Sequence, residues 1–152
     1  VIGTKGTIKS RSYEQEIKKL DPQVRVTAVA CPLFVPFVEE GWLSHGVVST
    51  VARRYLKPLK DSKVDTLILG CTHYPLLKGV IRDAMGSEVA LIDSAKQVAV
   101  EVNKILSDEG LLSSKTKGRA DFFVSDNPEW FKDLAGRFLG KPVKNVRKVN
   151  SV

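Results

Sequence analysis

Apolar and polar positions alternate along the chain in blocks that suit short strands and helices. The clearest strand is the continuous apolar run of residues 64–69, which is typical of a strand buried on both faces of a parallel sheet. Similar runs predict further strands at residues 24–30, 89–92, 120–124 and 143–149. Amphipathic spacing predicts helices at residues 10–20, 47–59, 75–85, 94–107 and 128–139, with a loop or short helix at residues 34–40.

This order of elements predicts an α/β fold with a mainly parallel sheet and flanking helices, because strand and helix alternate throughout. Ser94 is the expected N-cap of the helix that follows it. We expect one apolar face of this helix to pack against the sheet, formed by Val98, Val102, Ile105 and Leu106. The polar residues 108–119 predict a flexible loop.

Composition narrows the class of protein. The chain has 152 residues, 43% of them hydrophobic, which suits one domain or parts of two. Its net charge of +7 comes from scattered lysines and arginines without zinc-finger spacing or an aromatic stacking motif, so a nucleic-acid partner is not favoured. No signal peptide or apolar run of membrane length is present, and we expect a cytoplasmic protein without a membrane anchor. The start at Val-Ile-Gly, without methionine, suggests a fragment, a processed product or a missing beginning.

The two cysteines, Cys31 and Cys71, lie far apart and form no CxxC motif. This spacing argues against a disulfide scaffold and against a zinc site. Cys31 is followed by proline and surrounded by apolar residues, which favours a structural role. Cys71 follows the clearest strand and precedes a helix, where amide groups and the helix dipole favour a thiolate. The residues alone leave open whether Cys71 is a base or an inert buried thiol.

Ligands of parallel α/β sheets bind beyond the carboxyl ends of the strands, where three turns of this chain are expected. The turn at residues 3–7, GTKGT, offers hydroxyls and amides that could hold a carboxylate or phosphate, or it is an ordinary turn that needs its glycines. It matches neither a Walker motif nor GxGxxG. The other two turns begin at Cys31 and at Gly70.

Two histidines and a pair of glutamates complete the candidates. His73 lies two residues after Cys71 and could donate to its thiolate or relay a proton. Glu39 or Glu40 could orient a histidine through a carboxylate–imidazole contact, although a solvated carboxylate is the simpler interpretation. His45 is expected on the surface.

Residues 69–77, LGCTHYPLL, resemble the signature of the glutamate racemase family. Residues 1–8, VIGTKGTI, are similar to the Gly-Thr-x-x-Thr loop of that family. Residues 30–39, ACPLFVPFVE, resemble its Ala-Cys-Pro block, and residues 92–94, Ile-Asp-Ser, resemble the return into its first domain. The likeness covers nearly the whole chain.

The resemblance implies a racemase of glutamate that uses no cofactor or metal and supplies D-glutamate for peptidoglycan. Two cysteines on opposite faces of the α-carbon remove and return a proton. By motif, Cys71 would be the second cysteine and His73 would assist it. Glu39 would orient His73, and the substrate would be bound by Thr4, Thr7 and Thr72.

The family's Cys-Asn-Thr, Asp-Ser-Gly and Pro-Tyr-Gly motifs are missing from this sequence. The resemblance therefore implies the C-terminal part of a two-domain, pseudo-symmetric enzyme. Residues 1–92 would be its complete second domain, and residues 93–152 would be the returning part of the first. We expect such a chain to be inactive alone and to leave five aromatic side chains without partners, namely Phe122, Phe123, Trp130, Phe131 and Phe138.

Three points of function stay open in the sequence. An aspartate or hydantoin racemase shares the fold and the paired cysteines, although His73 after Cys71-Thr72 favours glutamate. A non-catalytic module that binds DNA gyrase, as some family members do, is a further alternative. The full enzyme is expected to be a homodimer.

Overall fold

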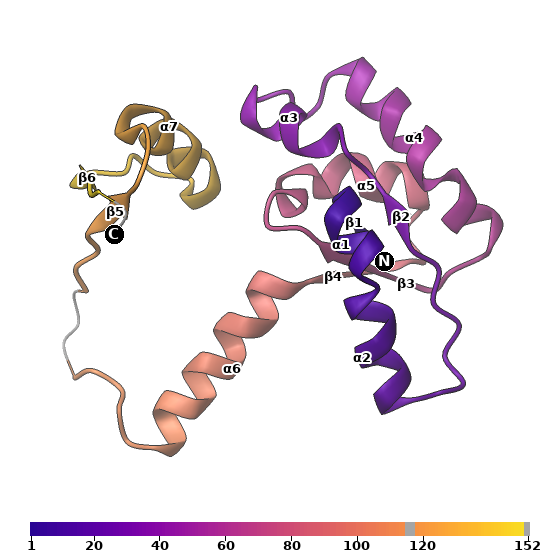
Figure 1. Ribbon diagram of the computed structural model, residues 1–152, viewed down its shortest axis with the longest axis horizontal. Helices are drawn as coiled ribbons and strands as arrows, with labels where there is room; N and C mark the ends of the chain where they lie inside the picture. The colour runs from indigo at the N-terminus through magenta and orange to yellow at the C-terminus, as the bar shows by residue number, and fades with distance from the viewer. Residues whose placement is uncertain (115–117, 151–152) are drawn as a thin grey trace. The chain divides into compact units, whose positions relative to one another are not determined.

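The computed structural model describes residues 1–114 and 118–150. The chain divides into two compact units, Val1–Ile105 and Leu106–Val152 (Figure 1). Each unit has its own parallel strands. The domain boundary expected after residue 92 stays a prediction.

The first unit is built on a four-stranded parallel sheet. Its strands are ordered β2-β1-β3-β4, with bounds β1 Ile2–Gly3, β2 Val29–Ala30, β3 Thr66–Gly70 and β4 Ala90–Asp93. This confirms the predicted α/β fold with a mainly parallel sheet. Gly3 is in register with Ala30 on one side and with Gly70 on the other. The carboxyl ends of these three strands therefore meet at one edge of the sheet.

Helices flank this sheet (Figure 1). Their bounds are α1 Lys5–Ser10, α2 Ser12–Leu20, α3 Phe34–Glu39, α4 Gly46–Asp61, the 3₁₀ turn η1 Tyr74–Leu77 and α5 Lys78–Met85. A further helix, α6 Ser94–Asp108, follows β4. α4 packs against α5, and α3 packs against η1. Burial of the apolar faces of these helices forms the core, which includes Phe34, Leu56, Leu69 and Ile81.

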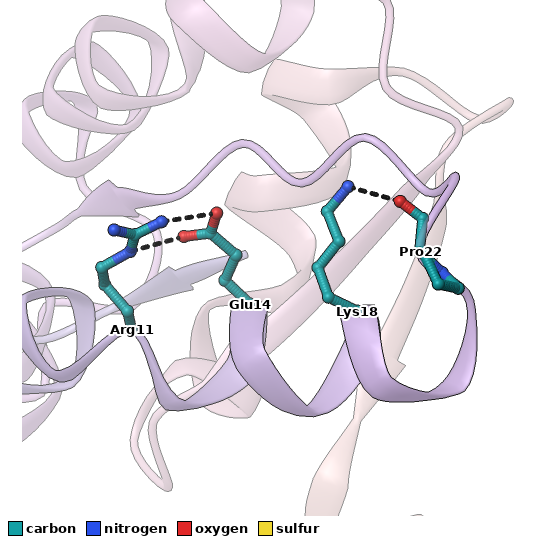
Figure 2. A network of polar contacts seen from close by, with 4 residues as sticks. All are labelled: Arg11, Glu14, Lys18 and Pro22. Carbon is teal, nitrogen blue, oxygen red and sulfur yellow. Dashed lines mark hydrogen bonds and ion pairs between the residues drawn. The ribbon is translucent and has the colours of Figure 1, made fainter.

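The helix predicted at residues 10–20 is α2, which starts at Ser12. The turn predicted at residues 3–7 was wrong in extent, because a separate short helix, α1, begins at Lys5; Arg11, in the left-handed conformation with φ 55°, separates the two helices. The Arg11 guanidinium donates two hydrogen bonds of 2.9 Å to the Glu14 carboxylate, which fixes the first turn of α2 (Figure 2). At the other end, Lys18 Nζ donates to the carbonyl of Pro22 at 2.9 Å (Figure 2). Both contacts are exposed, and they link α2 to the residues directly before and after it.

Two further predictions were wrong in extent. The strand expected at residues 24–30 is only Val29–Ala30, because its partner β1 is itself two residues long. The helix expected at residues 75–85 begins as the 3₁₀ turn η1 before α5 starts at Lys78.

The apolar face expected to pack inward from α6 does not do so. Val98, Val102 and Ile105 are 60%, 48% and 45% exposed, and none of the described α6 residues is buried. The helix begins directly after β4 and extends away from the sheet (Figure 1). Asp93 provides the cap instead of Ser94, since its Oδ1 accepts the Ala95 N–H at 3.0 Å.

The second unit holds a two-stranded parallel sheet and one helix. β5 is Phe122–Val124, α7 is Pro128–Leu139 and β6 is Val146–Lys148. The Asn127 side chain caps α7 by accepting the N–H groups of Glu129 and Trp130. A two-stranded parallel sheet leaves both outer edges unpaired and covers little apolar surface.

The exposure of aromatic side chains in this unit agrees only in part with the prediction. Phe123 and Trp130 are 59% and 50% exposed. Phe138 is 38% exposed but is not without a partner, so the prediction does not hold for it. The prediction was wrong for Phe122 and Phe131, because their rings contact each other with centroids 5.9 Å apart.

In the part of the chain that the structure describes, no helix combines the length and apolarity needed to cross a membrane.

Candidate active site

Two hydroxyls lie together at the carboxyl end of β1. Thr4 is the N-cap of α1, and its Oγ1 accepts the Thr7 N–H at 3.3 Å. The hydroxyls of Thr4 and Thr7 are 3.0 Å apart, and both side chains are partly exposed. Hydroxyls in this arrangement can donate to an oxygen anion placed at the strand end.

Cys71 lies at the carboxyl end of β3, beside the Thr4–Thr7 strand end. Its half-buried Sγ is 4.0 Å from Nδ1 of His73. The Thr72 hydroxyl lies 3.3 Å from the same nitrogen. The thiol and the imidazole are thus close enough to share or pass a proton.

Glu39 approaches the opposite nitrogen of the imidazole. Its Oε1, on the last turn of α3, is 3.5 Å from His73 Nε2. The exposed fractions of the two side chains are 21% for His73 and 34% for Glu39. A carboxylate at this place can hold the ring in one orientation. Glu39, His73 and Cys71 therefore form a continuous chain of polar contacts.

Cys31 is a different kind of thiol. It is fully buried, and its Sγ lies 3.9 Å from the carbonyl of Val29. Burial raises the pKa of the Cys31 thiol to about 12, so it stays neutral near pH 7. This environment agrees with the structural role that the sequence favoured.

Two residues near the site were not singled out in the sequence. The Tyr74 hydroxyl donates to the Cys31 carbonyl at 2.9 Å in the buried core. Lys78 donates to Asp93 at 2.5 Å, and this hydrogen bond holds the pKa of the Asp93 carboxyl below its usual range. Asp93 is in register with Leu69, next to the strand end that carries Cys71.

The remaining candidates lie outside this arrangement. His45 is exposed, as expected, and stacks on Trp42 with ring centroids 5.4 Å apart. Glu40 is exposed, in contrast to Glu39. Over residues 1–114 and 118–150, His, Cys, Asp and Glu side chains nowhere converge in threes as metal ligands would.

The two thiols should differ sharply in reactivity in the folded chain. We expect a thiol reagent to modify Cys71 quickly and Cys31 only after unfolding, because Cys31 is buried and neutral. Ellman's reagent should therefore count one thiol in native buffer and two in denaturant. Peptide mapping of the modified residue provides the check, and fast modification of Cys31 would contradict this description of the core.

Gly70 is required by the close approach of β1 and α2. A Cβ at this position would lie 2.8 Å from the carbonyl oxygen of Ile2 and 3.0 Å from the Tyr13 ring. We expect Gly70→Ala to lower the free energy of unfolding by about 1–3 kcal/mol, measured by urea denaturation. Gly79→Ala is the matched control, since a Cβ there meets nothing within 4 Å and alanine favours the helix. Equal stability of the two variants would contradict this packing.

Comparison with known proteins relates this chain to one enzyme family. Residues 1–102 match the family described as Asp/Glu/hydantoin racemase. The glutamate racemase of Geobacter metallireducens is 48% identical over 151 residues, which is 99% of this chain and 56% of that protein. The glutamate racemase of Corynebacterium diphtheriae is 50% identical over 149 residues, covering 97% of this chain and 56% of that protein.

Solved structures give the same result. Glutamate racemase isoform RacE1 from Bacillus anthracis superposes with a TM-score of 0.90 at 37% identity, covering 98% of this chain and 56% of that one. Glutamate racemase from Francisella tularensis, solved in complex with D-glutamate, gives a TM-score of 0.90 at 34% identity with the same coverage. The chain thus spans about half the length of the relatives that it matches.

Proposed function

This chain belongs to the Asp/Glu/hydantoin racemase family, and on that premise we propose that it provides one half of the active site of a glutamate racemase. The observation that carries the proposal is the polar chain from Glu39 through His73 to Cys71. It lies at the strand edge that also presents the Thr4 and Thr7 hydroxyls. A base of this kind suits removal of a carbon-bound proton from an amino acid whose carboxylates are held nearby.

Each group has a distinct role in this proposal. Cys71, as the thiolate, takes the α-proton of glutamate from one face or, as the thiol, returns a proton to that face. His73 donates to the thiolate from 4.0 Å, and Glu39 keeps the imidazole oriented. Thr4 and Thr7 bind a substrate carboxylate, and Thr72 binds substrate beside Cys71. No cofactor takes part.

A racemase needs a second acid–base group on the opposite face of the α-carbon. Cys31 does not qualify, because its side chain is fully buried and burial keeps its thiol neutral. We therefore place the second thiol in the part of the protein that the relatives have and this chain lacks. Residues 1–92 form the second domain, and residues 93–152 return to the first. The exposed aromatic side chains Phe123 and Trp130 fit such an incomplete domain.

A chimeric enzyme tests the proposal. The matched segment of the Geobacter metallireducens glutamate racemase is replaced by this chain, which is 48% identical to it. Circular dichroism then follows conversion of L-glutamate to D-glutamate. The chimera should racemise glutamate, and the 152-residue chain alone should form no D-glutamate. A folded chimera without activity on glutamate would contradict the proposal.

The same assay separates the neighbouring activities of the family. Activity of the chimera on aspartate or a hydantoin, but not on glutamate, would favour the other racemases. For the whole protein we propose, from the family likeness, a homodimer that supplies D-glutamate for peptidoglycan, with gyrase as an alternative partner, and, from the sequence, a cytoplasmic location.

A further inference from the structure

Two similar turns end the strands on either side of β1. In one, the Phe34 N–H donates to the carbonyl of Cys31 at 3.1 Å; in the other, the Tyr74 N–H donates to the carbonyl of Cys71 at 3.2 Å. Each turn therefore runs from a cysteine to an aromatic residue three positions later. Strands β2 and β3 pair with β1 and not with each other, so the sheet does not connect these turns directly.

The Tyr74 side chain makes the direct connection. Its hydroxyl donates to the Cys31 carbonyl at 2.9 Å, across 43 positions of sequence, in a fully buried environment. Its ring also meets the Phe34 ring edge to face, with centroids 5.2 Å apart. Burial raises the pKa of Tyr74, so the phenol remains a neutral donor.

The hydrogen bond from Tyr74 to Cys31 joins the segment that carries His73 to the segment that carries Glu39. His73 directly precedes Tyr74, and Glu39 closes α3, the six-residue helix that begins at Phe34. The N-cap residue of α3, Leu33, makes no side-chain cap hydrogen bond. The start of α3 is therefore held by the Cys31 carbonyl, which accepts from both Phe34 and Tyr74.

We propose that the Tyr74 hydroxyl is a positioning group that sets the contact between Glu39 and His73 and thereby the reactivity of Cys71. The inference rests on the proposed function of those three residues. Tyr74 itself does not reach the substrate. Its hydrogen bond to the Cys31 carbonyl keeps α3 and the Cys71–Tyr74 turn at the separation that allows the 3.5 Å contact of Glu39 with His73.

The test uses the full 152-residue chain and the rate at which iodoacetamide alkylates Cys71, followed over a range of pH by peptide mass spectrometry. The variants are Tyr74→Phe, Glu39→Gln and the double variant. Tyr55→Phe is the matched control, because Tyr55 also meets the Phe34 ring edge to face, at 5.6 Å. The number of thiols that Ellman's reagent detects confirms that Cys31 stays buried in each folded variant.

We expect Glu39→Gln to slow alkylation roughly tenfold near pH 7 and to leave the rate near pH 10 unchanged, because the imidazole is then no longer held with Nδ1 toward the Cys71 sulfur, and the thiolate needs no such help at high pH. Tyr74→Phe should move the pH profile in the same direction, and the double variant should move no further than Glu39→Gln. Tyr55→Phe should keep the parent profile.

The outcomes distinguish the two claims. If Glu39→Gln leaves the profile unchanged, the proposed relay and the positioning role both fail. If Glu39→Gln shifts the profile and Tyr74→Phe does not, or if their effects add, only the positioning role is overturned. A Tyr74→Phe chain that does not fold, with both thiols reactive, would also overturn it, because the hydroxyl would then be a structural requirement alone.

Discussion

Serine in place of Cys71 should lower glutamate racemisation by the chimeric enzyme about 10³-fold or more. The Cys71 side chain lies half-buried at the carboxyl edge of the sheet, 4.0 Å from His73 Nδ1, where a thiolate can meet a substrate. A serine hydroxyl is a far weaker acid, and an acid–base group of this kind contributes about 10²–10⁴-fold to rate. The measurement is kcat in both directions by circular dichroism.

Cys31→Ser is the matched control for that experiment. The Cys31 thiol is buried and neutral, so its loss should cost stability but leave kcat of the folded chimera close to that of the parent. Comparable losses of kcat in the two variants would show that the reactive thiol has been misassigned. Thermal unfolding of each variant separates instability from loss of chemistry.

Glu39→Gln and His73→Asn should each reduce kcat of the chimera, by about 10²-fold for the histidine and less for the glutamate. The reason is geometric, since Glu39 lies 3.5 Å from Nε2 of the ring whose Nδ1 faces Cys71. The effect should fall on kcat more than on KM, because neither side chain is proposed to bind the substrate carboxylates.

The chain offers a neighbouring control for both substitutions. Glu40 follows Glu39 but is exposed, and His45 is the only other histidine and is exposed beside Trp42. Glu40→Gln and His45→Asn should leave kcat unchanged. If Glu40→Gln reduced kcat as much as Glu39→Gln, a general loss of acidic charge would explain the effect and the oriented contact would not.

The sequence predicted the central features of the fold because they follow from local patterns. The buried run that became β3 and the capped helix α7 both have the length and periodicity of their type. Helix α1 was missed because its six residues are too few to show an apolar period and include a glycine typical of a turn. The exposed face of α6 was missed because amphipathic spacing shows that a helix has an apolar side, not that a partner covers it.

The candidate site shows the same division. The motif resemblance, together with the tendency of ligands to bind at strand ends, predicted that Thr4, Cys71 and His73 lie at one edge of the sheet. The structure places Glu39 in contact with His73. Tyr74 could not be predicted, because its partner is a backbone carbonyl 43 positions away. Contacts of that kind depend on the tertiary fold and carry no local sequence signal.

Exchange of the α-proton of glutamate with deuterium tests most directly whether Cys71 acts on one face of the substrate. The chimera and its Cys71→Ser variant are incubated in D₂O with each enantiomer separately, and proton NMR follows the Cα signal. A thiol that serves one face predicts that Cys71→Ser loses exchange with one enantiomer and keeps it with the other. Exchange that persists with both enantiomers, or that is lost equally with both, would contradict the assignment of Cys71 as the base on one face.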